Sequence, residues 1–405
     1  MKKIISALLA LSLVPTLCAC GGQSSKQAGS AASKTETSAV QTTESPEAAS
    51  AAAADTSLPP DTEPAATESD GDEELDFYVQ AYHFSGVVEI SKGDEPVFWR
   101  AANAESTYPK PEITIDSLLC VGSVSKQFCA TAILQLQEQG KLSTGDPLGK
   151  FFPECPYGDR VTLHQMLSMR SGIAEFYDTE YEDGCFNEMP VGELSGVVTN
   201  DGTVEGNRDT LQKWLFAQPL GFEPGSAFAY TNSNYFLLAR ITELVSGEKY
   251  EDYVRAHILR PLGMDSTGFI DEMLDDPRLA KSPHNPKTVY VGVTMGLGDM
   301  ISCAADMDKW LRSFAEHTVL TEDSLAEMTA NYCTEADGGA SYGYGVEPDA
   351  AGGLRHTGFF TSYFACSYTV PATGYRFFAV TNDQTDMAGS MTEMCGALIA
   401  VSAEA

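Results

Sequence analysis

A serine and a lysine stand three residues apart, as Ser123 and Lys126, where an amphipathic helix is expected to begin. Positions i and i+3 are neighbours on one helical face, so the Ser123 hydroxyl would lie beside the Lys126 amine. A lysine held out of bulk water could accept the serine proton and leave an activated alkoxide. The spacing therefore indicates acyl transfer without a catalytic histidine, although Ser-x-x-Lys alone also occurs by chance at solvated helix starts.

The residues after Lys126 favour a buried helix. Gly140 is a plausible stop for it. Apolar residues recur at helical spacing, namely Phe128, Cys129, Ala132, Ile133 and Leu136. Ser123 would then lie at the N-terminus of this helix, where free backbone N–H groups and the helix dipole favour developing negative charge.

Two later segments extend this pair into an ordered set. Tyr230 and Asn232 form a Tyr-x-Asn motif, and residues 356–358 read His-Thr-Gly. In this order the motifs resemble the serine β-lactamase and penicillin-binding protein family, and most closely its branch of class C β-lactamases, D-alanyl-D-alanine carboxypeptidases and esterases. Further local matches lie at residues 163–167, 171–173, 261–264 and 300–306.

The resemblance implies a role for each reactive residue. Ser123 attacks the substrate carbonyl, and Lys126, with its pKa depressed by burial, accepts the proton. Tyr230 shares that proton and donates to the leaving group; the alternative, a core tyrosine beside Phe228, is usual for an isolated tyrosine but is disfavoured here by the flanking Pro-Gly and Thr-Asn. Asn232 hydrogen-bonds Lys126 and the substrate amide, or caps the helix that follows, or does both.

The resemblance also assigns the substrate-binding strand. His356, Thr357 and Gly358 would form an edge strand that faces the cleft. The backbone N–H groups of Ser123 and Phe359 would form the oxyanion hole.

Two departures from the family pattern bear on the substrate, and a third is taken as structural drift. His356 stands where many relatives have lysine, and near its reference pKa of about 6.5 it would be mostly neutral at pH 7 and a weaker anchor for a carboxylate, which disfavours a β-lactamase. Residues 359–363 are bulky where glycines are frequent, and they could shape an apolar pocket or pack the core. Met169 and Arg170 replace His and Thr, and we assign them no role.

Strand and helix patterns at the two chain ends predict the fold. Residues 84–91 with 96–101, and 363–370 with 375–381, indicate two hairpins. Helices are predicted at 235–245, at 304–314 after a Ser302 cap, and at 391–401. The fold class is therefore α/β and β-lactamase/transpeptidase-like: an antiparallel sheet built from both chain ends, flanked by helices, with a mostly helical inserted region and a cleft at the junction.

The N-terminus indicates export. Residues 1–3 are Met-Lys-Lys and residues 4–17 are mostly apolar, as in a signal peptide. Residues 17–22 resemble the lipobox of bacterial lipoproteins, with Cys20 as the lipidated residue, and the alternative is an ordinary cleavable signal. We expect a signal at 1–20, an acidic Ser/Ala/Thr/Pro/Glu tether at 21–74 that is disordered, and a hydrolase domain at 75–405.

Composition excludes some partners. The net charge of −32 argues against nucleic acid and leaves a lipid anchor as the only expected membrane contact. Six dispersed histidines predict no metal, and no cofactor is expected. Of the ten cysteines, the eight outside the signal lack tight paired spacing, and Cys120, Cys129 and Cys303 are expected to be buried thiols.

The sequence thus predicts an extracytoplasmic, membrane-anchored serine hydrolase. Its substrate would be a small-molecule or peptidoglycan-derived acyl compound, as for a D-alanyl-D-alanine carboxypeptidase or an esterase. One alternative is a true β-lactamase. Another is a non-catalytic penicillin-binding sensor or surface interaction protein that keeps the pocket without turnover.

Overall fold

The computed structural model describes residues 73–82, 84–103, 113–176, 203–282, 292–383 and 388–403. The predicted signal, the lipidation site at Cys20 and the predicted tether up to residue 72 lie outside the described residues. Helix α2 (Glu73–Ala81) begins just before the predicted start of the folded domain. Within the described ranges, no helix has both the length and the apolar character that a membrane span requires.

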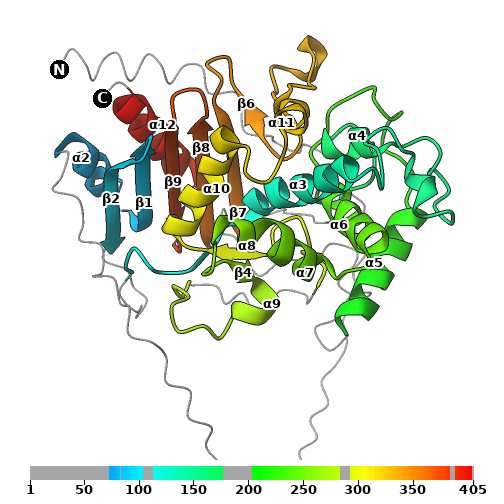
Figure 1. Cartoon of the computed structure of the whole chain (residues 1–405), viewed down its shortest axis with the longest axis horizontal. Coiled ribbons are helices and arrows are strands. Elements are labelled where there is room, and N and C mark those ends of the chain that lie inside the picture. Colours follow the sequence, from blue (N-terminus) through cyan, green and yellow to red (C-terminus); the bar gives the residue numbers. More distant parts are fainter. Residues whose placement is uncertain are drawn as a thin grey trace, which may run out of the picture. The chain divides into compact units, whose positions relative to one another are not determined.

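A six-stranded sheet joins the two ends of the described chain (Figure 1). Its order is β2-β1-β9-β8-β7-β6, and all neighbouring strands are antiparallel. The strands are β1 (Ser85–Lys92), β2 (Glu95–Asn103), β6 (Glu347–Pro348), β7 (Leu354–Phe360), β8 (Tyr363–Val370) and β9 (Tyr375–Thr381). Because β1 pairs with β9, the prediction of a sheet built from both chain ends is confirmed.

Both faces of this sheet are covered, so the residues of its central strands are buried in continuous runs rather than in alternation. All seven residues of β9 are buried. Helices α2 and α12 (Ala388–Ala403) pack on one face, against residues such as Val88 and Phe377. Helix α10 (Ala304–Glu316) packs on the other face, against Val87 and Phe378 (Figure 1). The sheet is therefore held in place by packing on both faces, and it can support a site at its edge.

A mostly helical region is inserted between β2 and β6, as predicted. Its α-helices besides α10 are α3 (Ser125–Glu138), α4 (Leu163–Leu167), α5 (Val204–Ala217), α6 (Asn232–Ser246), α7 (Tyr250–Val254), α8 (Arg260–Leu262), α9 (Ile270–Met273) and α11 (Glu322–Thr329). Shorter turns are the 3₁₀ segments η2 (Gly122–Val124), η3 (Leu148–Lys150) and η7 (Glu335–Asp337), and the π-helical η5 (Arg255–Leu259). A small sheet of β3 (Leu119–Cys120), β5 (Met300–Ser302) and β4 (Gly268–Phe269) was not predicted.

The predicted helices are present as α6, α10 and α12. Helix α6 ends at Gly247, whose φ of 78° gives the left-handed cap that glycine adopts without strain. The predicted cap of α10 is wrong, because Cys303 occupies the cap position and the Ser302 hydroxyl lies 2.8 Å from that of Thr267. Ser302 is instead a buried residue of β5.

The predicted state of three cysteines is confirmed. Cys120, Cys129 and Cys303 are buried free thiols. Burial raises the pKa of each, which keeps the thiol protonated and unreactive. They contribute to the core as small apolar side chains.

Candidate active site

Ser123 lies in the tight turn η2, which connects β3 to the central helix α3. The next serine holds this turn, because the Ser125 hydroxyl donates to the Gly122 carbonyl (2.7 Å) and accepts from the Met300 N–H (3.2 Å). Gly122 has a φ of 52°, and a Cβ there would lie 2.6 Å from the Phe359 nitrogen. The nucleophile turn therefore packs backbone to backbone against β7.

Lys126 is the second residue of α3 and is fully buried. Its Nζ donates to Ser123 Oγ at 2.9 Å, to Asn232 Oδ1 at 2.7 Å and to the Leu297 carbonyl at 2.7 Å. Burial lowers the lysine pKa to about 7, although the negative charge of Glu175 opposes this shift. Both the protonated and the neutral amine are therefore accessible near pH 7.

Tyr230 lies beside the lysine. The centre of its ring is 5.0 Å from Lys126 Nζ, and its edge packs on Tyr342 at 6.0 Å between ring centres. A second tyrosine, Tyr235 on α6, lies 5.8 Å from the same amine. Tyr230 thus lies among the reactive groups, where the sequence motif predicts it, and not isolated in the core.

Asn232 connects two charged groups. Its side chain forms the predicted hydrogen bond with Lys126, and its backbone N–H donates to the carboxylate of Glu175. The suggestion that Asn232 caps the following helix is wrong. It is the first residue of α6, and the cap position belongs to Thr231, which makes no side-chain cap bond.

His356 on β7 is buried, with 2% of its surface exposed. Its Nδ1 lies 2.6 Å from the Thr357 carbonyl, which can only accept, so Nδ1 carries the proton and Nε2 accepts from the Tyr342 hydroxyl at 3.2 Å. Burial lowers the His356 pKa to about 4. The ordinary pKa expected from the sequence is therefore too high, and the imidazole is neutral throughout the physiological range.

The prediction that residues 356–358 form a strand edge holds for these three residues, although β7 as a whole is not the outermost strand of the sheet. In the sheet order β6 lies outside β7, but it pairs only with Leu354 and Arg355. The segment from His356 onward keeps its edge against the serine turn. A Cβ on Gly358 would lie 2.0 Å from the Val121 carbonyl oxygen and 2.8 Å from the Ser123 nitrogen, so only glycine allows this approach.

The aromatic segment after the His-Thr-Gly motif packs the core. Phe359 contacts Phe364 edge to face, with ring centres 4.6 Å apart, within the apolar cluster beneath α12. Phe360 is buried in the core on the opposite face of the sheet, and the Tyr363 hydroxyl donates to the Ala280 carbonyl. Of the two alternatives left open by the sequence, these contacts support core packing over an apolar substrate pocket.

Met169 and Arg170 brace the loop that carries Tyr230. Arg170 forms an ion pair with Asp337 at 2.7 Å and donates to the Gly225 carbonyl at 3.0 Å. Met169 has a φ of 59°, and its sulfur accepts from the Thr231 N–H at 3.4 Å. These two residues therefore hold both ends of the 225–231 segment, a structural role that the sequence did not indicate.

Three groups of the site were missed from the sequence: Glu175, Tyr342 and the Leu297 carbonyl. A backbone carbonyl carries no signal in a sequence. Glu175 follows the Ser-Gly-Ile match at residues 171–173, and that position is the only hint the sequence offered.

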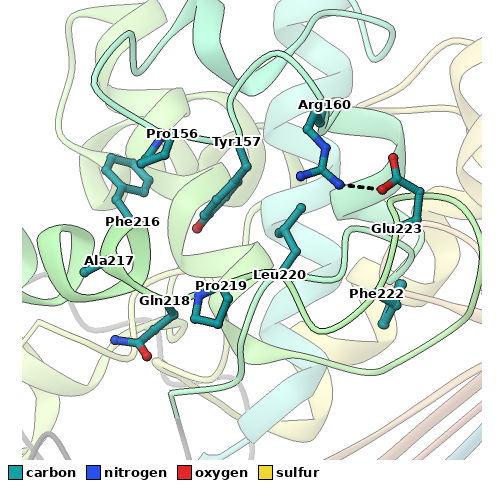
Figure 2. Close-up of a pocket in the computed structure, with 10 residues that line it drawn as sticks. All are labelled: Pro156, Tyr157, Arg160, Phe216, Ala217, Gln218, Pro219, Leu220, Phe222 and Glu223. Atoms are coloured by element: carbon teal, nitrogen blue, oxygen red, sulfur yellow. Dashed lines mark hydrogen bonds and ion pairs between the residues drawn. The ribbon is translucent and has the colours of Figure 1, made fainter.

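A cavity of about 630 Å³ lies elsewhere, between the 156–160 loop and the segment 216–223 (Figure 2). Its wall contains Tyr157, whose hydroxyl donates to the Leu215 carbonyl, and the exposed ion pair of Arg160 with Glu223. The ten residues drawn include no serine, cysteine, lysine or histidine. None of the predicted site residues therefore lines this cavity.

Comparison with known proteins agrees with this geometry. Residues 65–393 match the family described as Beta-lactamase. Over 270 residues the chain is 30% identical to a Bacillus subtilis (strain 168) protein described as "Putative penicillin-binding protein PbpX", and the match covers 64% of this chain and 62% of that protein. Over 287 residues it is 25% identical to a D-aminopeptidase of Brucella anthropi, covering 67% of this chain and 50% of that protein. The matches thus span between half and two thirds of these curated relatives.

A solved structure supports the fold assignment. The penicillin-binding protein from Bacillus halodurans superposes with a TM-score of 0.68 at 22% identity, covering 82% of this chain and 100% of that one. At this identity the likeness speaks for the fold alone. Because the family match extends over most of the sequence, the chain belongs to the Beta-lactamase family.

Proposed function

We propose that this protein is a cell-surface serine hydrolase that works through an acyl-enzyme on Ser123. The observation that carries the proposal is the 2.9 Å hydrogen bond between Ser123 Oγ and the Nζ of a fully buried Lys126 whose pKa is about 7. An amine that loses its proton near neutral pH can act as the general base for an adjacent hydroxyl.

In the proposed reaction, neutral Lys126 accepts the Ser123 proton while the serine oxygen bonds to the substrate carbonyl carbon. The N–H groups of Ser123 and Phe359 stabilise the oxyanion, a role supported by the close backbone contact between η2 and β7. Tyr230 delivers a proton to the leaving group. Water then attacks the acyl-enzyme, and the same groups return the proton to Ser123.

The proposed substrates are D-amino-acid peptides of the cell wall and small esters. Asn232 and the strand segment of His356, Thr357, Gly358 and Phe359 would hold the acyl chain. The names of the relatives, a penicillin-binding protein and a D-aminopeptidase, support this substrate class. The neutral His356 disfavours a true β-lactamase, because it offers no positive charge to a penicillin carboxylate.

The location is part of the proposal. The export signal, a lipid on Cys20 and the acidic tether at residues 21–74 would place the hydrolase domain of residues 75–405 outside the cytoplasm on the bacterial cell membrane. Radiolabelled palmitate incorporation into the wild-type chain but not into Cys20→Ala, followed in the producing cell, tests the anchor.

Covalent labelling tests the enzyme function. The full chain and its Ser123→Ala variant are treated separately with a fluorescent penicillin and a fluorophosphonate, and adducts are located by mass spectrometry. We expect the wild type to be labelled on Ser123 and the variant to remain unlabelled. Labelling of both proteins or of neither supports a non-catalytic sensor or surface interaction protein instead. Multiple turnover of a chromogenic cephalosporin supports a true β-lactamase.

A further inference from the structure

Glu175 places a carboxylate beside the reactive lysine. The Asn232 backbone N–H donates to this carboxylate, while the Asn232 side chain accepts from Lys126 Nζ. One residue thus separates an exposed negative charge from the amine that activates Ser123. Asn232 also begins the 15-residue helix α6, whose positive end stabilises an ionised carboxylate.

The backbone on both sides of Glu175 is fixed. The hydroxyl of Ser233 donates to the Ala174 carbonyl at 2.6 Å and accepts from the Phe176 N–H at 3.2 Å. Phe176 itself is buried in the core. A single serine on α6 therefore clamps the residues before and after Glu175, and this clamp sets where the carboxylate stands relative to Asn232.

The basic residues that border the site on other elements do not complement a negatively charged substrate. Arg170 is paired with Asp337 at 2.7 Å, and Arg355 is paired with Glu347 at 2.8 Å. His356 is buried and uncharged. A substrate carboxylate would meet the charge of Glu175 without a matching cation from these three residues, whereas a substrate ammonium would be attracted.

We propose that Glu175 binds the α-ammonium group of the acyl-donating residue, so that the preferred substrates are D-amino-acid amides, esters and peptides with a free amino terminus. This inference rests on the proposed function and names its substrate class. In this reaction Ser123 gains the aminoacyl group and the leaving amine or alcohol departs with a proton. Water then releases the free amino acid.

The test compares two chromogenic substrates on the full chain, D-alanine p-nitroanilide and its N-acetyl derivative. The measured quantity is the ratio of their kcat/KM values, which we call the amine preference. We expect a strong preference in the wild type and a 10- to 100-fold smaller one in Glu175→Gln, the range expected for a charge-assisted hydrogen bond. Glutamine can still accept from the Asn232 N–H, so the variant removes the charge and keeps the contact.

The matched controls separate recognition from structure. Glu223→Gln makes the same charge change on an exposed residue of another loop and should keep the amine preference. Glu175→Asp should recover part of it. In the wild type the preference should fall above about pH 8, where the substrate amine loses its proton, and Glu175→Gln should lack this fall.

An unchanged amine preference in Glu175→Gln, with Ser123 still labelled by a fluorophosphonate, overturns this inference and leaves the proposed function standing. So does a wild type that prefers the N-acetyl substrate. A wild type in which Ser123 cannot be labelled by any acylating reagent overturns the proposed function, and this inference falls with it.

Discussion

Lys126 on α3 and His356 on β7 are two buried basic side chains that differ in whether they can exchange a proton near neutral pH. Burial lowers the pKa of both, to about 7 for the lysine and about 4 for the histidine. The lysine starts from a high reference value and stops at neutrality among three acceptors, so it can exchange a proton. The histidine passes out of the physiological range and becomes a fixed neutral hydrogen-bonding group. Equal burial can therefore create a base in one place and remove a charge in another.

The largest expected effect follows from removing the base. Lys126→Ala should lower the rate of Ser123 acylation by at least about 1,000-fold, because proton transfer and the serine's hydrogen-bond partner are both lost. Stopped-flow labelling with a fluorophosphonate measures this rate, and circular dichroism checks the fold. Acylation within tenfold of the wild-type rate would show that Lys126 is not the base.

Tyr230→Phe should have the next largest effect. Loss of the phenol proton should slow acylation and deacylation by about 100-fold each, while the ring packing on Tyr342 is retained. Burst and steady-state hydrolysis of p-nitrophenyl acetate separate the two steps. Tyr332→Phe removes a phenol that donates to the Glu327 carbonyl outside the site and serves as the control. Full esterase turnover in Tyr230→Phe would disprove the assigned proton transfer.

The pH dependence should follow the lysine alone. Acylation requires neutral Lys126, so its rate should rise about tenfold per pH unit below pH 7 and level off above that value. Since His356 remains neutral, no second inflection should appear near pH 6.5. A pH profile of fluorophosphonate labelling shows whether each inflection is present. An inflection near pH 6.5 that disappears in His356→Gln would show that His356 titrates in the physiological range.

Replacing the neutral imidazole of His356 by a cation tests the comparison between His356 and Lys126 more directly. In His356→Lys a positive charge near Lys126 should move the inflection of the labelling profile to lower pH, because like charges disfavour each other's protonated form. Labelling by fluorescent penicillin should increase several-fold relative to a neutral ester. His356→Gln is the neutral control, and equal penicillin labelling in both variants would show that charge at this position does not recruit carboxylates.

The smallest effect is on stability. Lys126→Met should raise the free energy of unfolding at pH 7 by about 1 to 3 kcal/mol, because a buried amine is replaced by an apolar side chain of similar size. The folded lysine pKa lies below its usual value, so between pH 7 and 10.5 the unfolded wild type binds more protons and the wild type becomes more stable as pH rises. The advantage of the variant should thus shrink by about 1.4 kcal/mol per pH unit in this window. Urea unfolding at pH 7 and 9 measures the difference in free energy of unfolding between Lys126→Met and the wild type. A difference that grows with pH would contradict the lowered lysine pKa.

Local signals explain what could be predicted from the sequence. Residues 363–370 and 375–381 are rich in aromatic and β-branched residues and flank a Pro-Ala-Thr-Gly turn, and they form β8 and β9 with the predicted bounds. The Ser123 and Lys126 pairing is likewise a matter of three residues along one helix. Such features depend on neighbours in the chain, where propensity and periodicity are informative.

Long-range features were not predictable for the opposite reason. The Arg170 and Asp337 ion pair joins positions 167 residues apart, and the Leu297 carbonyl reaches Lys126 across 171. The burial of His356 depends on Tyr342 and on the serine turn packing over β7, which no local pattern encodes. The two-residue strands β3 and β4 are too short to show a period.

The backbone packing of Gly122 against Phe359, and of Gly358 against Val121 and Ser123, also determines when activity could arise during synthesis. The two amides that would hold the oxyanion belong to Ser123 and Phe359, which are far apart in the chain and are therefore synthesised at different times. The Phe359 amide is fixed only after β7 pairs with β8. We therefore expect a growing chain to remain inert until its final hairpin has emerged and docked. Hydrolysis then reports completed folding, and a truncated product would carry the nucleophile without the power to use it.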